Sequence, residues 1–265
     1  MIRSILFAIA FYIATALFLL LGSPLLLGPR RWAMMGLKAH AIACCWLLRL
    51  IVGTRLEVRG RENLPDGAVL VAAKHQSAWD TFGLVPLFRD PALVMKAELF
   101  RIPLYGWFSR KFGMVEVRRD KRSAAMRQLL VDTKDRAEAG REIVIFPEGT
   151  RTAPGAEPDF KPGLVLLYEG LGLPCVPMAI NSGMFWPRRV WRRYPGTIVV
   201  EFLPAIPPGV PRKVFKAQVE GAIERATSRL VLEARAKAAS PGSVAPLSAE
   251  ALARLEATAG AVVKR

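Results

Sequence analysis

The sequence predicts a mixed α/β domain, one sheet flanked by helices, preceded by a hydrophobic helical element that associates with a membrane. Three observations lead to this fold class. Short apolar runs of strand length alternate with longer helical patterns over residues 54–239. Residues 4–29 contain no charged side chain. The hydrophobic fraction, 52%, is high for a soluble enzyme, and the excess is concentrated at the start of the chain.

Residues 1–53 form the predicted membrane-associated segment. The uncharged run is long enough to cross a bilayer core, but a Gly-Ser-Pro sequence at 22–24 interrupts it. A helix over about Ile5–Leu21 followed by a turn is therefore equally consistent. The next segment, Trp32–Val52, is apolar but carries a lysine, a histidine and an arginine, which is typical of an interfacial or packed helix. A cleaved signal peptide is disfavoured because no convincing cleavage site follows. One span and insertion into one leaflet both stay open.

The predicted elements of the α/β domain, residues 54–239, follow from periodicity and from turn signals. The strands are Arg55–Arg59, Ala68–Lys74, Leu93–Lys96, Met114–Arg118, Glu142–Phe146, Cys175–Ile180 and Thr197–Leu203. The helices are Thr81–Phe88, Leu104–Lys111, Ser123–Ala139, Pro162–Glu169 and Arg212–Ala238, with Ser123 as a possible N-cap of the third. The Ala-rich tail, residues 240–265, is expected to be mobile, with one short helix near Ser248–Ala257.

A histidine and an aspartate separated by four residues stand at the end of the second predicted strand. His75 is one of only two histidines, and it comes just after the apolar run 68–73. Residues five apart on a helix lie about 140° apart around its axis, so a hydrogen bond between His75 and Asp80 requires a strand–turn–helix arrangement. In that arrangement His75 is a candidate general base and Asp80 its orienting carboxylate. The alternative is a capping arrangement, with Ser77 or Asp80 capping the helix that follows.

A second polar loop, residues 147–152, ends the fifth predicted strand. It contains Glu148, Gly149, Thr150 and Arg151, which supply a carboxylate, a flexible backbone, a hydroxyl and a guanidinium. The guanidinium is a planar fork suited to phosphate, and the glycine lets the backbone come close to a ligand. Ligands of open α/β sheets bind outside the carboxyl ends of strands, so the two polar loops are expected to share one crevice. A tight turn with a surface salt bridge is the alternative.

Taken together, these segments resemble the glycerolipid acyltransferase family, in particular 1-acylglycerol-3-phosphate acyltransferases. His75–Asp80 matches the first family motif, and Phe146–Thr152 matches the phosphate-binding motif. The other two motifs also have matches in order, over Lys96–Leu99, Ile102–Pro103, Gly106–Trp107 and Arg118 for the second and over Pro174–Ile180 for the fourth. The resemblance covers residues from about 55 to 205.

Two positions depart from the family pattern. Lys74 stands where asparagine is commonest, and Thr152 replaces the usual serine. Both departures conserve polarity. We expect that neither touches the proposed base, so that the chemistry is intact and only the head-group specificity is affected.

The resemblance implies transfer of a fatty acyl group from acyl-coenzyme A or acyl carrier protein to the sn-2 hydroxyl of 1-acylglycerol 3-phosphate (lysophosphatidic acid), giving phosphatidic acid. His75, held by Asp80, is the expected base. No serine or cysteine stands beside it as an obvious nucleophile, which predicts direct transfer without an acyl-enzyme. Neither a metal nor a cofactor is implied. The expected substrate-binding residues are Lys96, Arg118, Glu148, Gly149, Thr150 and Arg151, with Lys161 a weaker candidate.

The formal net charge of +16 points to anionic partners. Much of it lies in mixed aromatic and basic segments such as Trp186–Tyr194, which are typical of the headgroup level of a membrane. The same charge suits lysophosphatidate and an acidic thioester donor. A solvated basic surface is the alternative for that segment. Nucleic-acid binding would rest on charge alone, because no such motif accompanies it.

Other sequence features argue against several classes of protein and leave some alternative functions open. The three cysteines have no zinc-binding spacing, and there is no serine-hydrolase elbow or dinucleotide-binding glycine loop. Reduced cysteines agree with the expected location, the cytoplasmic face of a bacterial inner membrane. Glycerol 3-phosphate and a lyso-aminolipid are alternative acceptors. A non-catalytic membrane-surface lipid-binding protein is the alternative of another class.

Overall fold

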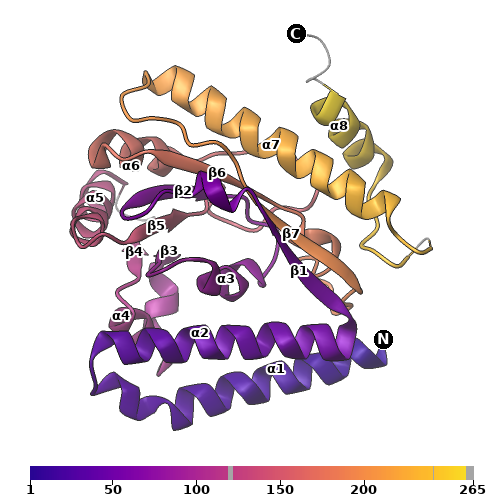
Figure 1. Cartoon of the computed structure of the whole chain (residues 1–265), viewed down its shortest axis with the longest axis horizontal. Coiled ribbons are helices and arrows are strands. Elements are labelled where there is room, and N and C mark those ends of the chain that lie inside the picture. Colours follow the sequence, from indigo (N-terminus) through magenta and orange to yellow (C-terminus); the bar gives the residue numbers. More distant parts are fainter. Residues whose placement is uncertain (119–121, 241, 261–265) are drawn as a thin grey trace.

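A seven-stranded sheet forms the centre of the molecule (Figure 1). The computed structural model describes residues 1–118, 122–240 and 242–260. The strand order is β1-β7-β6-β2-β5-β3-β4, and all seven predicted strands are confirmed. Their bounds are Thr54–Arg59 (β1), Val69–Ala73 (β2), Ala92–Lys96 (β3), Val115–Val117 (β4), Glu142–Ile145 (β5), Cys175–Ile180 (β6) and Gly196–Phe202 (β7).

The sheet is mixed, as predicted. Five neighbouring strands, β6, β2, β5, β3 and β4, are parallel, whereas β7 pairs antiparallel with β6 and β1 pairs parallel with β7. The carboxyl ends of the five parallel strands therefore meet at one edge. At the centre, Val69 of β2 is in register with Glu142 of β5. The segments that follow these two strands, residues 74–80 and 146–152, consequently begin side by side.

The two faces of the sheet carry different helices. Val69, Val71 and Ala73 of β2 belong to a core that includes residues of α1, α2 and α3. Leu70 and Ala72 belong to a second core with α5, α6 and α7. This alternation is the two-residue period of a strand buried on both sides. The bounds are Asp80–Gly83 (α3), Tyr105–Lys111 (α4), Arg122–Glu138 (α5), Gly163–Leu171 (α6) and Arg212–Ala236 (α7).

One predicted helix is wrong in its extent. The pattern predicts a single helix over Thr81–Phe88, but α3 ends at Gly83 and a 3-10 turn follows over Val85–Leu87. Pro86 stands inside that turn. A proline has no N–H for the helical hydrogen bond and its ring clashes with the preceding turn, so the helix cannot continue through it. The predicted N-cap Ser123 has a side chain outside the described part of the chain.

The amino-terminal segment is a helical hairpin that lies along one side of the domain (Figure 1). It consists of α1 (Ile2–Leu21) and α2 (Arg30–Leu47), and a π-helical turn extends α2 to Val52. Near its start, α1 packs Phe7 edge-on against Trp186, with ring centroids 5.2 Å apart. Towards its end, Phe18 packs against Phe108 of α4 at 5.2 Å. Both halves of α1 therefore contact the α/β domain.

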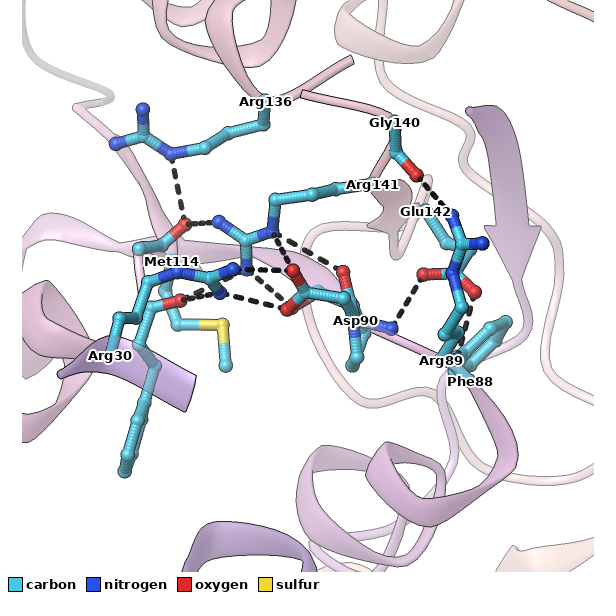
Figure 2. A network of polar contacts seen from close by, with 12 residues as sticks. Arg30, Phe88, Arg89, Asp90, Met114, Arg136, Gly140, Arg141 and Glu142 are labelled. Atoms are coloured by element: carbon cyan, nitrogen blue, oxygen red, sulfur yellow. Dashed lines mark hydrogen bonds and ion pairs between the residues drawn. The ribbon is translucent and has the colours of Figure 1, made fainter. Parts of the chain in front are cut away.

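A polar network fastens the start of α2 to the domain (Figure 2). Asp90 forms ion pairs with Arg30 of α2, at 2.5 Å, and with Arg141, at 3.4 Å. The Arg141 guanidinium also donates to the carbonyl oxygens of Pro91, Phe112 and Gly113. Burial lowers the pKa of Arg141 to about 10 although Asp90 opposes the shift. The network thus connects the hairpin, through the exposed Arg30 and the partly exposed Asp90, to the buried guanidinium of Arg141.

The carboxyl-terminal tail contains the short helix that the sequence predicts near Ser248–Ala257. This helix, α8, extends over Ala249–Gly260 and packs on α7. Leu255 of α8 is buried, and Arg254 donates to the carbonyl oxygen of Gly155. This apolar contact and this hydrogen bond hold the described part of the tail against the domain.

Candidate active site

His75 and Asp80 are in direct contact. The imidazole Nδ1 lies 3.0 Å from Asp80 Oδ2. The chain leaves β2, turns through residues 74–79 and begins α3 at Asp80, which is the strand–turn–helix arrangement that the spacing requires. Asp80 is fully buried, and His75 is 9% exposed. A carboxylate at this nitrogen favours the tautomer with its proton on Nδ1, which leaves the Nε2 lone pair as the base.

Asp80 also binds the backbone of the turn. Its Oδ2 accepts the backbone N–H groups of Gln76 and Ser77, each at 2.8 Å, and its Oδ1 accepts the hydroxyl of Ser182 at 2.6 Å. Asp80 thus orders the turn that precedes α3, whereas the alternative in which Ser77 or Asp80 caps this helix is not confirmed, because no side chain in the described part of the chain caps its start. The hydrogen bonds from Gln76, Ser77 and Ser182 fix the Asp80 carboxylate. Because this carboxylate binds the imidazole of His75, they also fix the orientation of the imidazole.

The imidazole stacks on a side chain from the neighbouring strand end. Phe146 follows β5, and its ring centroid lies 4.1 Å from that of His75 with an interplanar angle of 24°. Phe146 packs against the core that includes residues of α1, α2 and α3. The ring of His75 is consequently directed towards the face of the sheet that carries the amino-terminal hairpin.

The loop 147–152 lies against the backbone of His75, as the shared-crevice prediction requires. Gly149 adopts a positive φ of 63° and closes a turn through its N–H to the carbonyl of Phe146, a conformation that favours glycine. The Thr152 N–H donates to the carbonyl of His75 at 2.8 Å, and its hydroxyl oxygen lies 3.2 Å from the same carbonyl oxygen. The expectation that the Thr152 position does not touch the proposed base is therefore wrong.

Glu148 binds the backbone of His75. Its Oε2 accepts the backbone N–H of His75 at 3.0 Å, and its Oε1 accepts the hydroxyl of Thr152 at 2.6 Å. The ammonium of Lys74 lies 2.6 Å from the same Oε1. Both carboxylate oxygens are engaged by the protein and Glu148 is buried, so we interpret it as a support of the site and not as a direct substrate contact.

A third charged group completes this cluster, and the sequence pattern does not show it. Glu224 of α7 accepts a hydrogen bond from Lys74 at 2.6 Å. Burial lowers the pKa of Lys74, but the two carboxylates outweigh it and leave the pKa above its ordinary value. Burial raises the pKa of Glu224, and Lys74 offsets this only in part. A lysine directly after a buried strand signals that counter-charges are needed, but their identity depends on the packing of α7.

Arg151 is half-buried at the rim of the same loop, next to the Thr152 contact with His75. Its backbone carbonyl accepts a hydrogen bond from Arg188 at 2.8 Å, which ties the loop to the segment after β6. Within the described part of the chain its guanidinium has no hydrogen-bond or ion-pair partner. Thr150 is half-buried beside it. A half-buried guanidinium without a partner among the described residues, on the loop that contacts the backbone of His75, is suited to recognition of an anionic acceptor.

Lys96 and Arg118 lie farther along the same edge of the sheet. Lys96 ends β3 and is exposed, and Arg118 follows β4 and forms an ion pair with Glu116 at 2.8 Å. β3 and β4 are two and three strands from β2, which corresponds to roughly 10 and 15 Å at the usual strand spacing. Their roles in substrate binding stay predictions. The same holds for Lys161, which is exposed and paired with Asp159.

Comparison with known proteins shows which family part of this chain resembles. Residues 55–181, which contain the His–Asp pair and the loop of Glu148 and Arg151, match the family model described as "Acyltransferase". The matched segment is just under half of the chain. The family match includes β1 to β6 and leaves out the amino-terminal hairpin, β7, α7 and α8.

The chain is also similar to curated relatives. It is 38% identical over 161 residues to the 1-acyl-sn-glycerol-3-phosphate acyltransferase of Pseudomonas aeruginosa, and this match covers 61% of this chain and 63% of that protein. It is 34% identical over 166 residues to the lyso-ornithine lipid O-acyltransferase of Rhodobacter capsulatus, covering 61% of this chain and 57% of the relative. The chain thus spans about three fifths of the length of these two relatives.

The fold extends beyond the matched segment. The crystal structure of the 1-acyl-sn-glycerophosphate (LPA) acyltransferase PlsC from Thermotoga maritima superposes with a TM-score of 0.73 at 24% identity. The superposition covers 86% of this chain and 96% of that one. The architecture described above is therefore that of a known acyltransferase structure.

Proposed function

We propose that this protein transfers a fatty acyl group from a thioester to the sn-2 hydroxyl of 1-acylglycerol 3-phosphate, giving phosphatidic acid. The observation that carries the proposal is the contact between His75 and buried Asp80, directly beside the loop that presents Arg151. One group can take a proton and the other can bind a phosphate. The relatives from Pseudomonas aeruginosa and other organisms that are named for this reaction support the choice of acceptor.

The base acts in both halves of the transfer. Nε2 of His75 removes the proton of the acceptor hydroxyl while its oxygen attacks the thioester carbonyl carbon. The new C–O bond forms, the C–S bond breaks, and the imidazolium returns the proton to the leaving thiolate. Asp80 stabilises the imidazolium between these events. Arg151 holds the acceptor phosphate, so that the hydroxyl meets a thioester in a fixed orientation.

The surroundings of His75 favour direct transfer without an acyl-enzyme. The hydroxyl of Ser77 accepts the backbone N–H of Trp79 and is fully buried. The hydroxyl of Ser182 is committed to Asp80. Cys175 is buried in β6, and burial raises the pKa of its thiol above the ordinary value, which disfavours a thiolate nucleophile.

The hairpin gives the enzyme its membrane attachment. Both α1 and the segment Arg30–Val52 are long and apolar enough to cross a bilayer by length and composition. However, both halves of α1 contact the α/β domain, so a perpendicular crossing would draw that domain into the hydrocarbon. We therefore place the hairpin in one leaflet, with its unpaired apolar side chains in the lipid; those exposed on the two helices include Ile5, Ile9, Tyr12, Ile13, Leu17, Met35 and Trp46.

The basic loop 186–194 extends this surface. Ser4 of α1 accepts the backbone N–H of Arg193 at 2.9 Å, which fixes the loop at the start of the hairpin. Trp191 is 73% exposed, and Arg192 lies over the ring of Tyr194. Exposed tryptophan and arginine suit the headgroup level of an anionic membrane. Thioester donors, acyl-coenzyme A or acyl carrier protein, would reach the site from the cytoplasm, which assigns the enzyme to the cytoplasmic face of a bacterial inner membrane.

A second acceptor is favoured by one observation, the 34% identity to the lyso-ornithine lipid O-acyltransferase. The same His–Asp pair would serve that reaction, but an ornithine head group offers no phosphate to Arg151. Dependence on the acceptor phosphate therefore separates the two functions.

The test is an acyl-transfer assay on full-length protein in lipid or detergent, with His75→Ala as the control. Acyl-coenzyme A and acyl carrier protein are each offered with lysophosphatidate, glycerol 3-phosphate and a lyso-aminolipid. Transfer to lysophosphatidate that is lost in His75→Ala supports the proposal. Transfer to another acceptor alone would keep the mechanism and replace the substrate. Absence of transfer from both donors to all three acceptors would favour a non-catalytic lipid-binding protein.

A further inference from the structure

The buried ammonium of Lys74 has no role in the proton transfer described above. Its side chain is 3% exposed, and its nitrogen lies 2.6 Å from Glu148 Oε1 and 2.6 Å from Glu224 Oε1. A charge this deeply buried persists only when opposite charges compensate the loss of water. The chain thus maintains a cluster of one cation and two carboxylates immediately behind the catalytic strand end.

The cluster reaches the base through the backbone. Lys74 and His75 are consecutive residues of an extended segment, so their side chains point to opposite faces of the sheet. Lys74 meets α7 on one face, while His75 stacks on Phe146 on the other. Glu148 connects the two, because one of its oxygens binds Lys74 and the other accepts the N–H of His75.

Both peptide groups that flank His75 depend on this arrangement. The N–H of His75 is held by Glu148, and its carbonyl oxygen by the N–H of Thr152. The hydroxyl of Thr152 donates its one proton to Oε1 of Glu148 at 2.6 Å, so the same threonine contacts both His75 and Glu148. A displacement of the Glu148 carboxylate would therefore move the backbone on which the imidazole is carried.

We propose that Lys74 is a positioning residue: its ammonium, balanced by Glu224 from α7, holds Glu148 in place and thereby fixes the backbone of His75 against the Arg151 loop. The activity measurement rests on the proposed function, whereas the position of His75 can be measured without it. The cluster carries a net charge of −1, one ammonium against two carboxylates. The experiment changes the net charge of this cluster in one variant and restores it in another.

Three variants separate charge balance from mere packing. Lys74→Gln leaves two buried carboxylates facing each other without a cation, which makes the cluster −2. Lys74→Gln/Glu224→Gln restores −1 with amide donors in place of the ammonium. Lys216→Gln is the matched control, because Lys216 lies on α7 at the same cavity of about 580 Å³ as Lys74 and Glu224 but is exposed.

Two quantities are measured on each full-length variant after folding is verified by circular dichroism. The first is kcat at saturating acceptor. The second is the rate at which diethylpyrocarbonate modifies His75, followed by mass spectrometry with His40, the only other histidine, as internal reference. For Lys74→Gln we expect kcat to fall about 100-fold, the effect of a displacement on the order of 1 Å, and His75 to be modified severalfold faster. Lys216→Gln should match the wild type in both.

The double variant decides the matter. It should recover at least about fivefold in kcat over Lys74→Gln and return the modification rate of His75 towards the wild-type value, because contacting residues are energetically coupled. A wild-type kcat and modification rate in Lys74→Gln would overturn the proposal. So would a folded double variant that is no better than Lys74→Gln.

Failure of the proposed function gives a different result. If the wild type transfers no acyl group to any acceptor, the proposed reaction is wrong, and the modification rates alone decide the role of Lys74. If Lys74→Gln does not fold, the double variant carries the test. It should then fold with the His75 reactivity of the wild type, and a folded double variant with freely reactive His75 would refute the role of Lys74.

Discussion

Replacing Asp80 by asparagine separates the two tasks of this carboxylate. An asparagine oxygen in the place of Oδ2 can still accept the N–H groups of His75, Gln76 and Ser77. Its NH₂ group then faces the hydroxyl of Ser182, which can rotate to accept. The ordered turn and the imidazole tautomer are thus preserved, and the negative charge is lost.

The expected loss follows from the bond to the imidazole. In the transition state that bond joins an imidazolium to a carboxylate across 3.0 Å in a fully buried position. A hydrogen bond to a charged group contributes about 1.5–3 kcal/mol, compared with about 1 kcal/mol for a neutral one. The difference is about 0.5–2 kcal/mol, and each 1.36 kcal/mol is a factor of ten in rate, so Asp80→Asn should reduce kcat by about 2- to 30-fold, with little change in acceptor KM.

The assay is steady-state acyl transfer with saturating thioester, in which kcat and acceptor KM are determined separately. Ser182→Ala is the matched control: it removes one hydrogen bond to Asp80 but keeps the charge, so kcat should change less than in Asp80→Asn. Thermal unfolding of both variants verifies that the turn is intact. Wild-type kcat in a folded Asp80→Asn protein would show that the carboxylate orders the turn and does nothing more.

Three further perturbations test other parts of the molecule. Arg151→Ala should raise the KM for lysophosphatidate about 10- to 100-fold by removing a charge-assisted phosphate contact, and an unchanged KM would contradict the phosphate assignment. Asp90→Asn should lower the free energy of unfolding by about 1–3 kcal/mol at neutral pH, because Arg30 and buried Arg141 lose their carboxylate partner. Partial burial raises the pKa of Asp90, but these arginines outweigh it and leave the pKa below its ordinary value of 3.8, so denaturant titrations should show a difference that is complete above about pH 4 and disappears in stronger acid. Trp191→Ala should weaken co-sedimentation with anionic vesicles severalfold, and equal binding would remove the loop from the membrane surface.

The central strands were predictable because they are short apolar runs bounded by polar or turn residues, whereas the edge strand β1 alternates apolar and charged residues. Cys175–Ile180 is reproduced to the residue, since all six side chains are buried and both neighbours of the strand are turn signals. The direction of β7 was not predictable. The sequence of β7 does not show that this strand pairs antiparallel with β6. The strand direction depends on how the connection between β6 and β7 packs, which includes the 3-10 turn Ser182–Met184.

The catalytic pair was predictable because its geometry is local. Five residues of turn suffice to bring His75 to Asp80, and the spacing itself excludes a helix. The supporting contacts are not local. Ser182 and Glu224 lie 102 and 144 residues beyond Asp80 in the chain, and only the sheet order and the position of α7 bring them to the site.

The departures at Lys74 and Thr152 show why polarity alone is a poor guide to whether a position matters. Because both departures conserve polarity, the sequence predicts that neither affects the proposed base. Thr152 nevertheless binds the carbonyl of His75, and Lys74 binds the carboxylate that holds its N–H. A side chain on the far face of a strand can affect a catalytic residue only through the backbone. On β2, alternate residues face the core that includes the amino-terminal hairpin and the core that includes α5, α6 and α7. The charges around Lys74 involve α7, whereas the ring of His75 stacks on Phe146, which packs against the first core.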